Sequence, residues 1–223
     1  MESQSRPLII EFGGEQLELL PEKAIWWASR RTLLVADVHC GKDATFRAMG
    51  VPVPSGGTDR DLKRLSELVR RTEAERLMIL GDLLHARLTK HPELVECIAR
   101  WRKLHPQTRM VLVRGNHDRS SGTVPLHWEM EICEETTEED GFVFCHAPPR
   151  SAERPTLAGH VHPTVFLPDY DGSVVNVPCF ICEGNCLILP SFGTFTGGYT
   201  ISPGEGRRIY VVTPKRVVAM RNS

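Results

Sequence analysis

Between Thr32 and Asp118 the chain alternates apolar runs with amphipathic segments, and this alternation restricts the fold more than any other feature. The apolar runs are "TLLVADVH", "RLMILGD" and "RMVLVRGNHD". Between them lie "DRDLKRLSELVRR", with three leucines on one helical face, and "HPELVECIARWRKLH". The hydroxyl of Thr58 would cap the first of these two helices. The strand–helix–strand–helix–strand series predicts stacked βαβ units with a parallel sheet.

The segments on either side carry strand patterns. "PLIIEF" and "EQLELL" alternate apolar and polar residues and are separated by Gly13-Gly14, which predicts a hairpin. After Leu126, short strands and turns rich in Gly, Pro and Asp replace the helices. The expected fold class is therefore α/β, with two sheets packed on each other as an α/β sandwich and helices outside. No repeat or linker interrupts residues 1–223, so we expect a single domain.

Composition limits the class of protein. Hydrophobic residues make up 41% and charged residues 25%, as in ordinary globular proteins. No apolar run has the length of a membrane span, and the first residues lack the form of a signal peptide, so we expect a cytoplasmic protein. The seven cysteines predict free thiols in a reducing compartment. A thiolate metal site at Cys179, Cys182 and Cys186 is the alternative, but no second CxxC motif completes it.

The net charge of −1 argues against a protein that coats nucleic acid. The charge is unevenly distributed, because the segment from Glu129 to Asp140 holds seven acids and no basic residue. Removing those seven negative charges from the net of −1 leaves +6 on the rest of the chain. We interpret the acidic segment as a solvated edge strand and turn.

Polar side chains follow the apolar strands at five successive strand ends. These ends read "VADVH", "ILGDLLH", "VRGNHD", "VFCHAP" and "LAGHVHP". Ligands of α/β sheets gather beyond the carboxyl ends of strands, so these side chains are expected to converge. A lone Asp or His in such a place is often only a turn residue, but six of the nine histidines lie here. The converging candidates are Asp37, His39, Asp82, Asn116, His117, His146, His160 and His162.

The backbone around these motifs also has a pattern. Asp37 and His39 are two residues apart, as are His160 and His162, and in an extended chain each pair would point to one side. Glycines at positions 81, 115 and 159 are expected where the backbone turns sharply to present a side chain.

The donor types indicate the chemistry. Oxygen and imidazole ligands without thiolate suit Mn²⁺, Fe²⁺ or Zn²⁺. Seven ligands are too many for one catalytic ion that must keep a position open, but they suit two ions that share a carboxylate. Two such ions, about 3.5–4 Å apart, can bind the charged oxygens of a phosphate. The sequence therefore predicts a two-metal site for phosphate ester chemistry.

The ordered motifs D-x-H, G-D, G-N-H-D, a single His and G-H-x-H resemble those of the calcineurin-like binuclear metallophosphoesterases, over roughly Leu33 to Pro163. The resemblance implies that His117 is free to protonate the departing oxygen and that Asp118 orients its ring. It also implies one ion held by Asp37, His39, Asp82 and His162, and a second held by Asp82, Asn116, His146 and His160.

Longer stretches such as "ADVHCGKDATFRAMGVPVPSGG", "LGDLLHAR", "LAGHVHPTV" and "LPSFGTFTGG" are similar to one clade of that superfamily, the ligase-associated DNA damage response endonucleases. These are bacterial manganese-dependent enzymes encoded beside a helicase and a DNA ligase. The resemblance implies manganese as cofactor, single-stranded DNA as substrate, and the helicase and ligase as partners. It makes His85 a second phosphate contact, although a histidine that merely packs at this position is the alternative.

Basic residues flank the motifs and are candidates to bind the phosphates beside the cut. Each of them alone is as easily an ordinary surface residue. Trp26 and Trp27 are candidate stacking platforms for bases, and at least one of them is expected in the core. The sequence has no helix-turn-helix or zinc finger, which favours cutting by DNA structure over sequence. The basic candidates are Lys42, Arg47, Arg87, Arg119 and Arg150, together with Arg114 and Arg154.

Three functions remain open at this level. The first is a single-strand DNA endonuclease in DNA repair that uses two metal ions and a histidine acid. The second is a phosphoesterase of the same superfamily that acts on a small molecule or nucleotide, since the metal chemistry would be the same. The third is a binding module that has lost catalysis, which the complete set of ligands disfavours.

Overall fold

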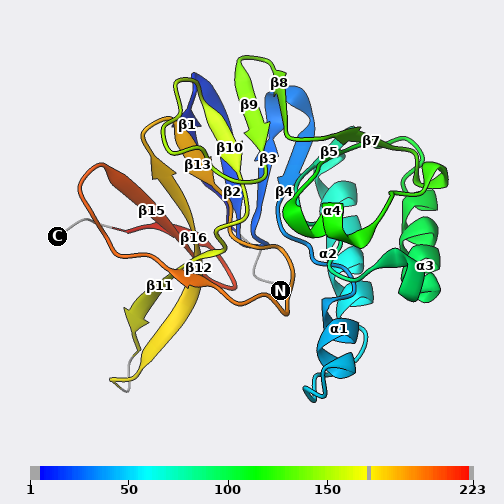
Figure 1. The fold of residues 1–223 in the computed structure, drawn as a ribbon. Helices are drawn as coiled ribbons and strands as arrows, with labels where there is room; N and C mark the ends of the chain where they lie inside the picture. Colours follow the sequence, from blue (N-terminus) through cyan, green and yellow to red (C-terminus); the bar gives the residue numbers. More distant parts are fainter. Residues whose placement is uncertain (1–5, 170–171, 221–223) are drawn as a thin grey trace.

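The computed structural model describes residues 6–169 and 172–220, whose strands form two sheets (Figure 1). The first sheet has seven strands in the order β1-β2-β3-β4-β5-β6-β7. Its strands β4, β5, β6 and β7 run parallel, and the others pair antiparallel. The strand bounds are β1 Leu8–Phe12, β2 Glu15–Leu20, β3 Ala24–Trp27, β4 Thr32–Val35, β5 Arg76–Leu80, β6 Arg109–Val113 and β7 Met130–Cys133.

The second sheet has nine strands. Seven follow the order β14-β11-β12-β13-β10-β9-β8, and β15 pairs with both β12 and β16. Within it, β9, β10 and β13 are parallel neighbours. The bounds are β8 Thr136–Glu139, β9 Phe142–Cys145, β10 Thr156–Ala158, β11 Pro163–Pro168, β12 Val174–Glu183, β13 Cys186–Ile188, β14 Tyr199–Thr200, β15 Arg207–Val212 and β16 Val217–Ala219.

The helices cover the face of the first sheet that is turned away from the second sheet (Figure 1). In the described part of the chain, no helix is both long and apolar enough to span a bilayer. The α-helices are α1 Lys42–Ala48, α2 Gly57–Thr72, α3 Pro92–Lys103 and α4 Asn116–Ser121, and the 3₁₀ turns are η1 Ala28–Arg30, η2 Leu88–Lys90 and η3 Leu126–Trp128.

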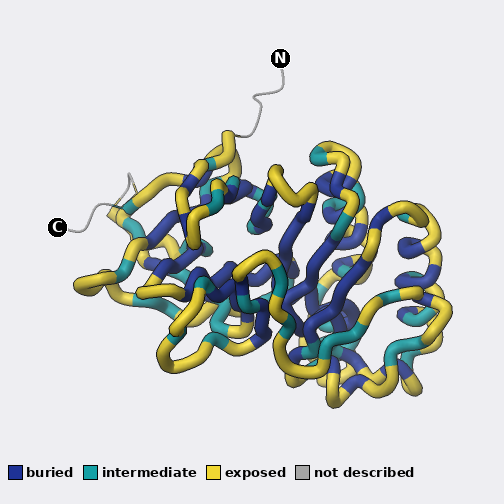
Figure 2. Tube along the Cα trace, turned by 90° about the horizontal axis from the view of Figure 1, so that it is seen from above, coloured by how far each residue is buried: buried dark blue, intermediate teal, exposed yellow. Residues whose placement is uncertain are grey.

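Strand alternation in the first sheet divides the core into two layers. In β4, Leu33 and Val35 pack toward the helices, whereas Leu34 packs between the sheets against aromatic side chains that include Phe144 and Phe180. The strands β5 and β6 alternate in the same way. Figure 2 shows the strand centres buried and the connecting loops exposed. Because both faces of these strands are covered, they read as continuous apolar runs in the sequence.

The predicted α/β sandwich, the first hairpin and the two long helices are confirmed. The predicted cap at Thr58 is wrong. The helix α2 begins at Gly57, whose N–H donates to the Asp43 carboxylate of α1, 3.2 Å away. The hydroxyl of Thr58 instead accepts from the N–H of Gly41, at 2.8 Å. The acceptor for the helix start therefore comes from another helix, which no local pattern could reveal.

The acidic segment contributes an edge strand to each sheet, as predicted: β7 borders the first sheet and β8 the second. Trp27 is 2% exposed and lies in the core between the sheets, so it is no stacking platform for bases. Trp26 is partly buried and packs on the helix side of the sheet. All seven cysteines are free, and Cys182 packs in a different core layer from Cys179 and Cys186. The three thiols therefore do not form a common metal site.

Candidate metal centre

The polar strand ends from the two sheets meet at one edge of the sandwich. Asp37 follows β4, Asp82 follows β5 and Asn116 opens α4 after β6, all at the carboxyl ends of parallel strands. His146 follows β9, and His160 follows the parallel neighbour β10. The first sheet thus supplies mainly carboxylate donors to this edge, and the second sheet supplies histidines.

Most of these donors lie on strained backbone. Asp37, His39, Asp82, His160 and His162 have left-handed φ angles between 50° and 70°. A non-glycine residue held in this region costs on the order of 1–3 kcal/mol and persists only where surrounding structure enforces it. The expected extended D-x-H and H-x-H geometry is therefore wrong, since both residues of each pair have a left-handed φ. Five such residues in one place are typical of a functional site.

Three donors form the first group. Asp37, His39 and His162 each offer one ligand atom within 4.8 Å of the others. The Nε2 atoms of His39 and His162 are 3.3 Å apart, and Nε2 of His162 is 3.3 Å from Oδ1 of Asp37. Two ligands about 2.0–2.1 Å from one ion are separated by about 3.0–3.4 Å, so these spacings fit a shared ion.

The second group contains Asp82, His146 and His160, whose ligand atoms also lie within 4.8 Å of one another. Nε2 of His146 is 3.0 Å from Nδ1 of His160 and 3.1 Å from Oδ1 of Asn116. The Asp82 carboxylate lies between the groups, with Oδ2 3.5 Å from Nε2 of His146 and 4.0 Å from Nε2 of His39. Asp82 is thus placed to bridge two ions.

Hydrogen bonds to the backbone orient two of the imidazoles. Nδ1–H of His146 donates to the Leu80 carbonyl at 3.1 Å, and Nδ1–H of His162 donates to the Gly197 carbonyl at 3.2 Å. Each bond leaves Nε2 unprotonated and directed at the centre, the arrangement that metal-binding histidines need. Burial lowers the pKa of His39, which favours its neutral, ligating form.

One buried atom tests whether this centre suits a cation. Oδ1 of Asp37 is buried and has no hydrogen-bond partner among the described residues, while Oδ2 accepts from the N–H of His160 at 2.8 Å. An unpaired buried carboxylate oxygen is costly unless a cation is bound to it. Hard oxygen and imidazole donors without thiolate also match a divalent transition metal. The residues present therefore fit two ions.

Two further histidines lie beside the first group. The rings of His85 and His117 stack, with centroids 4.6 Å apart, and both meet the His39 ring edge-on. Nδ1 of His85 is 3.4 Å from the hydroxyl of Thr45. Burial, followed by the charges of His117 and Lys42, lowers the pKa of His85 to about 4. His85 and His117 therefore face the same space on one side of the centre.

Asp118 has a different role from the one expected. Its Oδ1 accepts from the N–H of Leu84 and its Oδ2 from the N–H of Gly115, both at 2.9 Å. Asp118 makes no hydrogen bond with the His117 ring in the described part of the chain. The prediction that Asp118 orients this ring is therefore wrong. Burial raises the pKa of Asp118 to about 6. The carboxylate joins the loop after β5 to the loop after β6, which fixes Asp82 relative to Asn116.

We expect Asp118→Asn to lower the free energy of unfolding by about 1–3 kcal/mol, because the amide would direct its NH₂ at a backbone donor and leave both unsatisfied. Urea denaturation in chelator measures this loss without any contribution from metal. The exposed Asp59→Asn is the matched control and should change stability by less than about 0.5 kcal/mol. Equal effects of the two variants would contradict the role assigned to Asp118.

The three glycines at the strand ends were predicted to lie where the backbone turns sharply. This prediction is correct only for Gly81, which has a left-handed φ of 79°. Gly115 has φ of −88°, open to any residue, and Gly159 also lacks a positive φ. These two are required for space. A Cβ on Gly115 would lie 2.1 Å from Oδ1 of Asp82, and a Cβ on Gly159 would lie 2.8 Å from Oδ2 of Asp37. Packing against the carboxylates, not turning, selects glycine there.

Gly115→Ala should therefore displace the Asp82 carboxylate and weaken metal binding by about 10–100-fold. This is the usual loss when the groups that support a metal ligand are disturbed. Calorimetric titration with Mn²⁺ measures it. The control is Gly204→Ala, where an added Cβ meets nothing within 4 Å and φ is not positive. Unchanged affinity in Gly115→Ala would contradict the close packing seen here.

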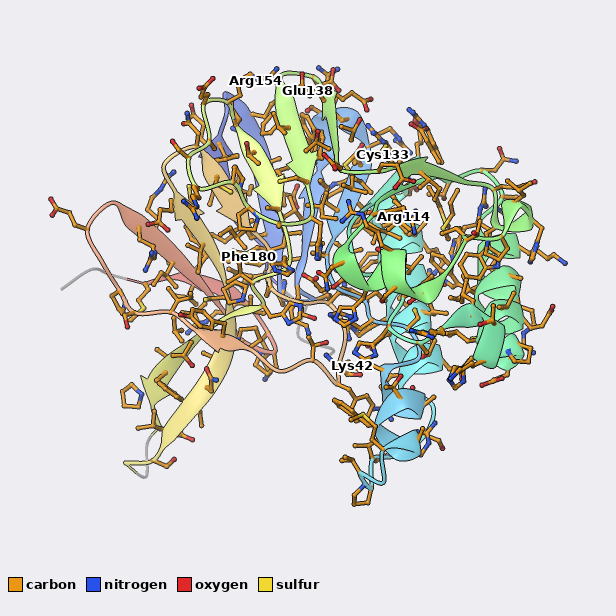
Figure 3. The ribbon with its side chains drawn as sticks, in the orientation of Figure 1. Lys42, Arg114, Cys133, Glu138, Arg154 and Phe180 are labelled. Carbon is orange, nitrogen blue, oxygen red and sulfur yellow. The ribbon has the colours of Figure 1, made fainter. Side chains whose placement is uncertain are left out.

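The basic candidates divide into two sets. Arg114 and Arg154 pair with Glu134 and Glu138 of the acidic segment, and Arg154 lies far from Lys42 (Figure 3). Arg119 donates to the Glu134 carbonyl, and Arg47 pairs with Asp43 at 3.2 Å. The acidic segment thus occupies several arginines that were expected to bind phosphate.

Lys42 lies at the centre, where burial lowers its pKa while the charges of Asp37 and Asp82 raise it. Arg87 and Arg150 are exposed.

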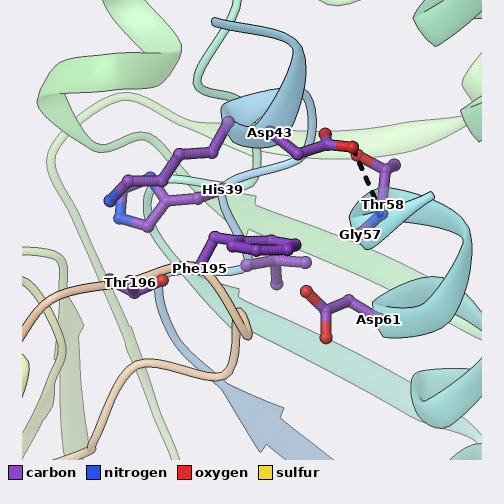
Figure 4. A pocket seen from close by; sticks show the side chains of 9 residues that line it. His39, Asp43, Gly57, Thr58, Asp61, Phe195 and Thr196 are labelled. Atoms are coloured by element: carbon purple, nitrogen blue, oxygen red, sulfur yellow. Dashed lines mark hydrogen bonds between the residues drawn. The ribbon is translucent and has the colours of Figure 1, made fainter. Parts of the chain in front are cut away.

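The segment from Ser191 to Gly198 supports the centre, a role that was not predicted from the sequence. Oγ of Ser191 donates to the Asp37 carbonyl at 2.8 Å, and the N–H of Gly193 donates to the same carbonyl at 3.1 Å. In Figure 4 the Phe195 ring lies between His39 and Asp61. The one signal in the sequence is the motif "SFGTF", which closely follows a core strand.

The chain is similar to known proteins of one family. The family model for calcineurin-like phosphoesterases matches residues 30–149. A Pseudomonas putida protein solved as "nuclease MPE" is 38% identical, with a TM-score of 0.83 over 96% of this chain and 100% of that chain. Yfce, a phosphoesterase from E. coli, is 16% identical over 82% of this chain and 87% of that one, with a TM-score of 0.41. No curated protein sequence matches. The chain belongs to the calcineurin-like phosphoesterase family and is a metal-dependent hydrolase of phosphate esters.

Proposed function

We propose that this protein is a single-strand DNA endonuclease that uses two divalent metal ions, and that the metal is manganese. The observation that carries the proposal is the pair of donor groups on either side of Asp82, with His117 and His85 next to them. The similarity to the Pseudomonas putida nuclease supports a nucleic acid as substrate. The sequence resemblance extends the proposal to DNA repair in the cytoplasm, alongside a helicase and a ligase.

In this proposal Asp37, His39 and His162 would hold one ion, Asn116, His146 and His160 would hold the other, and Asp82 would be shared by both. When bound, the two ions activate water and neutralise charge on the phosphate. His117 donates a proton to the departing oxygen of the strand, a role suited to an imidazole that is only partly buried. His85, stacked on His117, contacts a phosphate oxygen on the same side. Among the basic candidates predicted from the sequence, Lys42, Arg87 and Arg150 remain available to bind the flanking phosphates.

The test uses circular single-stranded DNA, because loss of circles requires internal cutting. Protein freed of metal by chelation is incubated with Mn²⁺, Zn²⁺ or Mg²⁺ separately, and His85→Ala runs in parallel. Each protein also receives bis(p-nitrophenyl) phosphate. We expect the wild type to linearise circles with Mn²⁺, and His85→Ala to fail to do so, because the variant lacks the contact to the phosphate oxygen. If the wild type leaves the circles intact but hydrolyses the small diester, the choice of DNA as substrate is contradicted.

The second candidate is a phosphoesterase for a small molecule or nucleotide. The donor groups favour it as much as they favour a nuclease, because the metal chemistry is the same for both. This alternative would be supported if the protein hydrolysed a nucleotide diester at least tenfold faster, per scissile bond, than it hydrolysed an oligonucleotide.

A further inference from the structure

A cavity of about 240 Å³ adjoins the metal centre and is not used by the proposed chemistry. His162 forms part of its wall, so the cavity opens from the first donor group. Its other walls come from the turn between β2 and β3, from β11 and β12, and from the segment that follows β13. The residues of interest among them are Lys23, Thr164, Asn176 and Thr196.

Lys23 gives this cavity a positive charge. It is the only lysine or arginine among the described residues of the wall, which include no carboxylate. Its Nζ donates to the Gly193 carbonyl at 3.2 Å, and an ammonium has three N–H groups, so two remain for a ligand. Burial and the nearby charge of Arg64 lower the pKa of Lys23 to about 8, and the nearby charge of Asp61 partly opposes them. An anion in the cavity would offset both effects.

The turn between β2 and β3 places Lys23 in the wall of the cavity. Lys23 has a left-handed φ of 67°, which other turn residues such as Asp140 share. The hydroxyl oxygens of Thr164 and Thr196 are buried and have no hydrogen-bond partner among the described residues, so they add no hydrogen-bonding surface to the cavity.

The face of the β11–β12 hairpin continues outward from the cavity. Thr164 pairs with Pro178, and Phe166 pairs with Asn176. Residues two apart on a strand, and residues directly opposite each other, share a face, so Phe166 is on the face that lines the cavity. Phe166 is 58% exposed. An exposed aromatic ring at the outer end of a charged cavity is the arrangement that single-strand binding sites use for a base and a phosphate.

We propose that this cavity is a nucleotide subsite of the substrate strand, in which Lys23 binds the phosphate next to the scissile one and Phe166 stacks on a base. The subsite deepens the proposed function and depends on it. It extends along the β11–β12 side of the centre, away from the helix α4 that carries His117 (Figure 1).

The test compares oligothymidylate with bis(p-nitrophenyl) phosphate, which has no flanking phosphate. For Lys23→Gln we expect KM for the oligonucleotide to rise about tenfold. The slope of log KM against log salt should fall by about 0.7, the value for one lost contact with a single strand. Hydrolysis of the small diester should stay within about twofold of wild type. Lys23→Arg should restore most of the loss, and Phe166→Ala should raise KM without changing the salt slope.

The matched control is Lys103→Gln, an exposed lysine at the end of α3. If Lys23→Gln behaves as Lys103→Gln does, the subsite is overturned. Equal losses on both substrates would also overturn it, because Lys23 would then act by supporting the centre through Gly193. If the wild type hydrolyses the diester but not the oligonucleotide, the proposed function fails. Fluorescence anisotropy with metal-free protein and labelled oligothymidylate then decides the subsite: weaker binding by Lys23→Gln supports it and equal binding overturns it.

Discussion

Asp82→Asn should remove the cooperation between the two donor groups and reduce the binding of Mn²⁺ from two ions per chain to one or none. The reason is geometric, because Oδ2 of Asp82 is the carboxylate oxygen within 4.0 Å of His39 in one group and His146 in the other. An amide can offer one neutral oxygen but no bridging negative charge. We expect phosphodiester hydrolysis to fall by about 10³-fold, since a catalytic ion contributes several kcal/mol and each 1.4 kcal/mol is worth a factor of about ten.

Stability provides a second readout for Asp82→Asn. Burial raises the pKa of Asp82, and the nearby charge of Asp37 acts in the same direction, so the metal-free protein holds two carboxylates that repel each other. The variant should therefore melt no lower than wild type in chelator. It should also lose most of the rise in Tm that Mn²⁺ gives to wild type through binding of the native state. A rise equal to that of wild type would contradict the bridging position.

His117→Ala should slow DNA cleavage by about 10²–10⁴-fold, the usual contribution of a positioned general acid. The loss should be much smaller on bis(p-nitrophenyl) phosphate, because p-nitrophenolate leaves without being protonated. Metal binding should be unchanged, since His117 belongs to neither donor group around Asp82 and only its backbone N–H bonds to that carboxylate, at 2.9 Å. Parallel kinetics on the two substrates and a calorimetric Mn²⁺ titration measure all three quantities.

The control for this variant is His127→Ala, an exposed histidine in η3. It should change none of the three quantities by more than about twofold. Equal losses on DNA and on the small diester by His117→Ala would mean that His117 stabilises charge at the centre and does not protonate a leaving group. Loss of one bound ion would place His117 among the ligands, in a group with His39 and His85, whose ligand atoms also lie within 4.8 Å.

The sequence by itself determined the architecture and indicated which side chains would meet at one edge. Strands buried on both faces are continuous apolar runs, and their carboxyl ends must meet at one edge, so Asp37, Asp82 and Asn116 could be grouped from their positions in the chain alone. His146 and His160 could be added because the same pattern recurs after β9 and β10. These properties are local, and each can be recognised within about ten residues of chain.

Only the tertiary structure decided how each group is used. The carboxylate of Asp118 is bonded to two backbone N–H groups, one of them 34 residues away at Leu84, and no local pattern distinguishes that role from orientation of a neighbouring ring. The arginines 114 and 154 are paired with an acidic segment that folds against them. Nζ of Lys23 donates to the Gly193 carbonyl, 170 residues away along the chain. Such contacts depend on chain segments that meet only when the two sheets pack, so they are set by the fold and are absent from any short stretch of sequence.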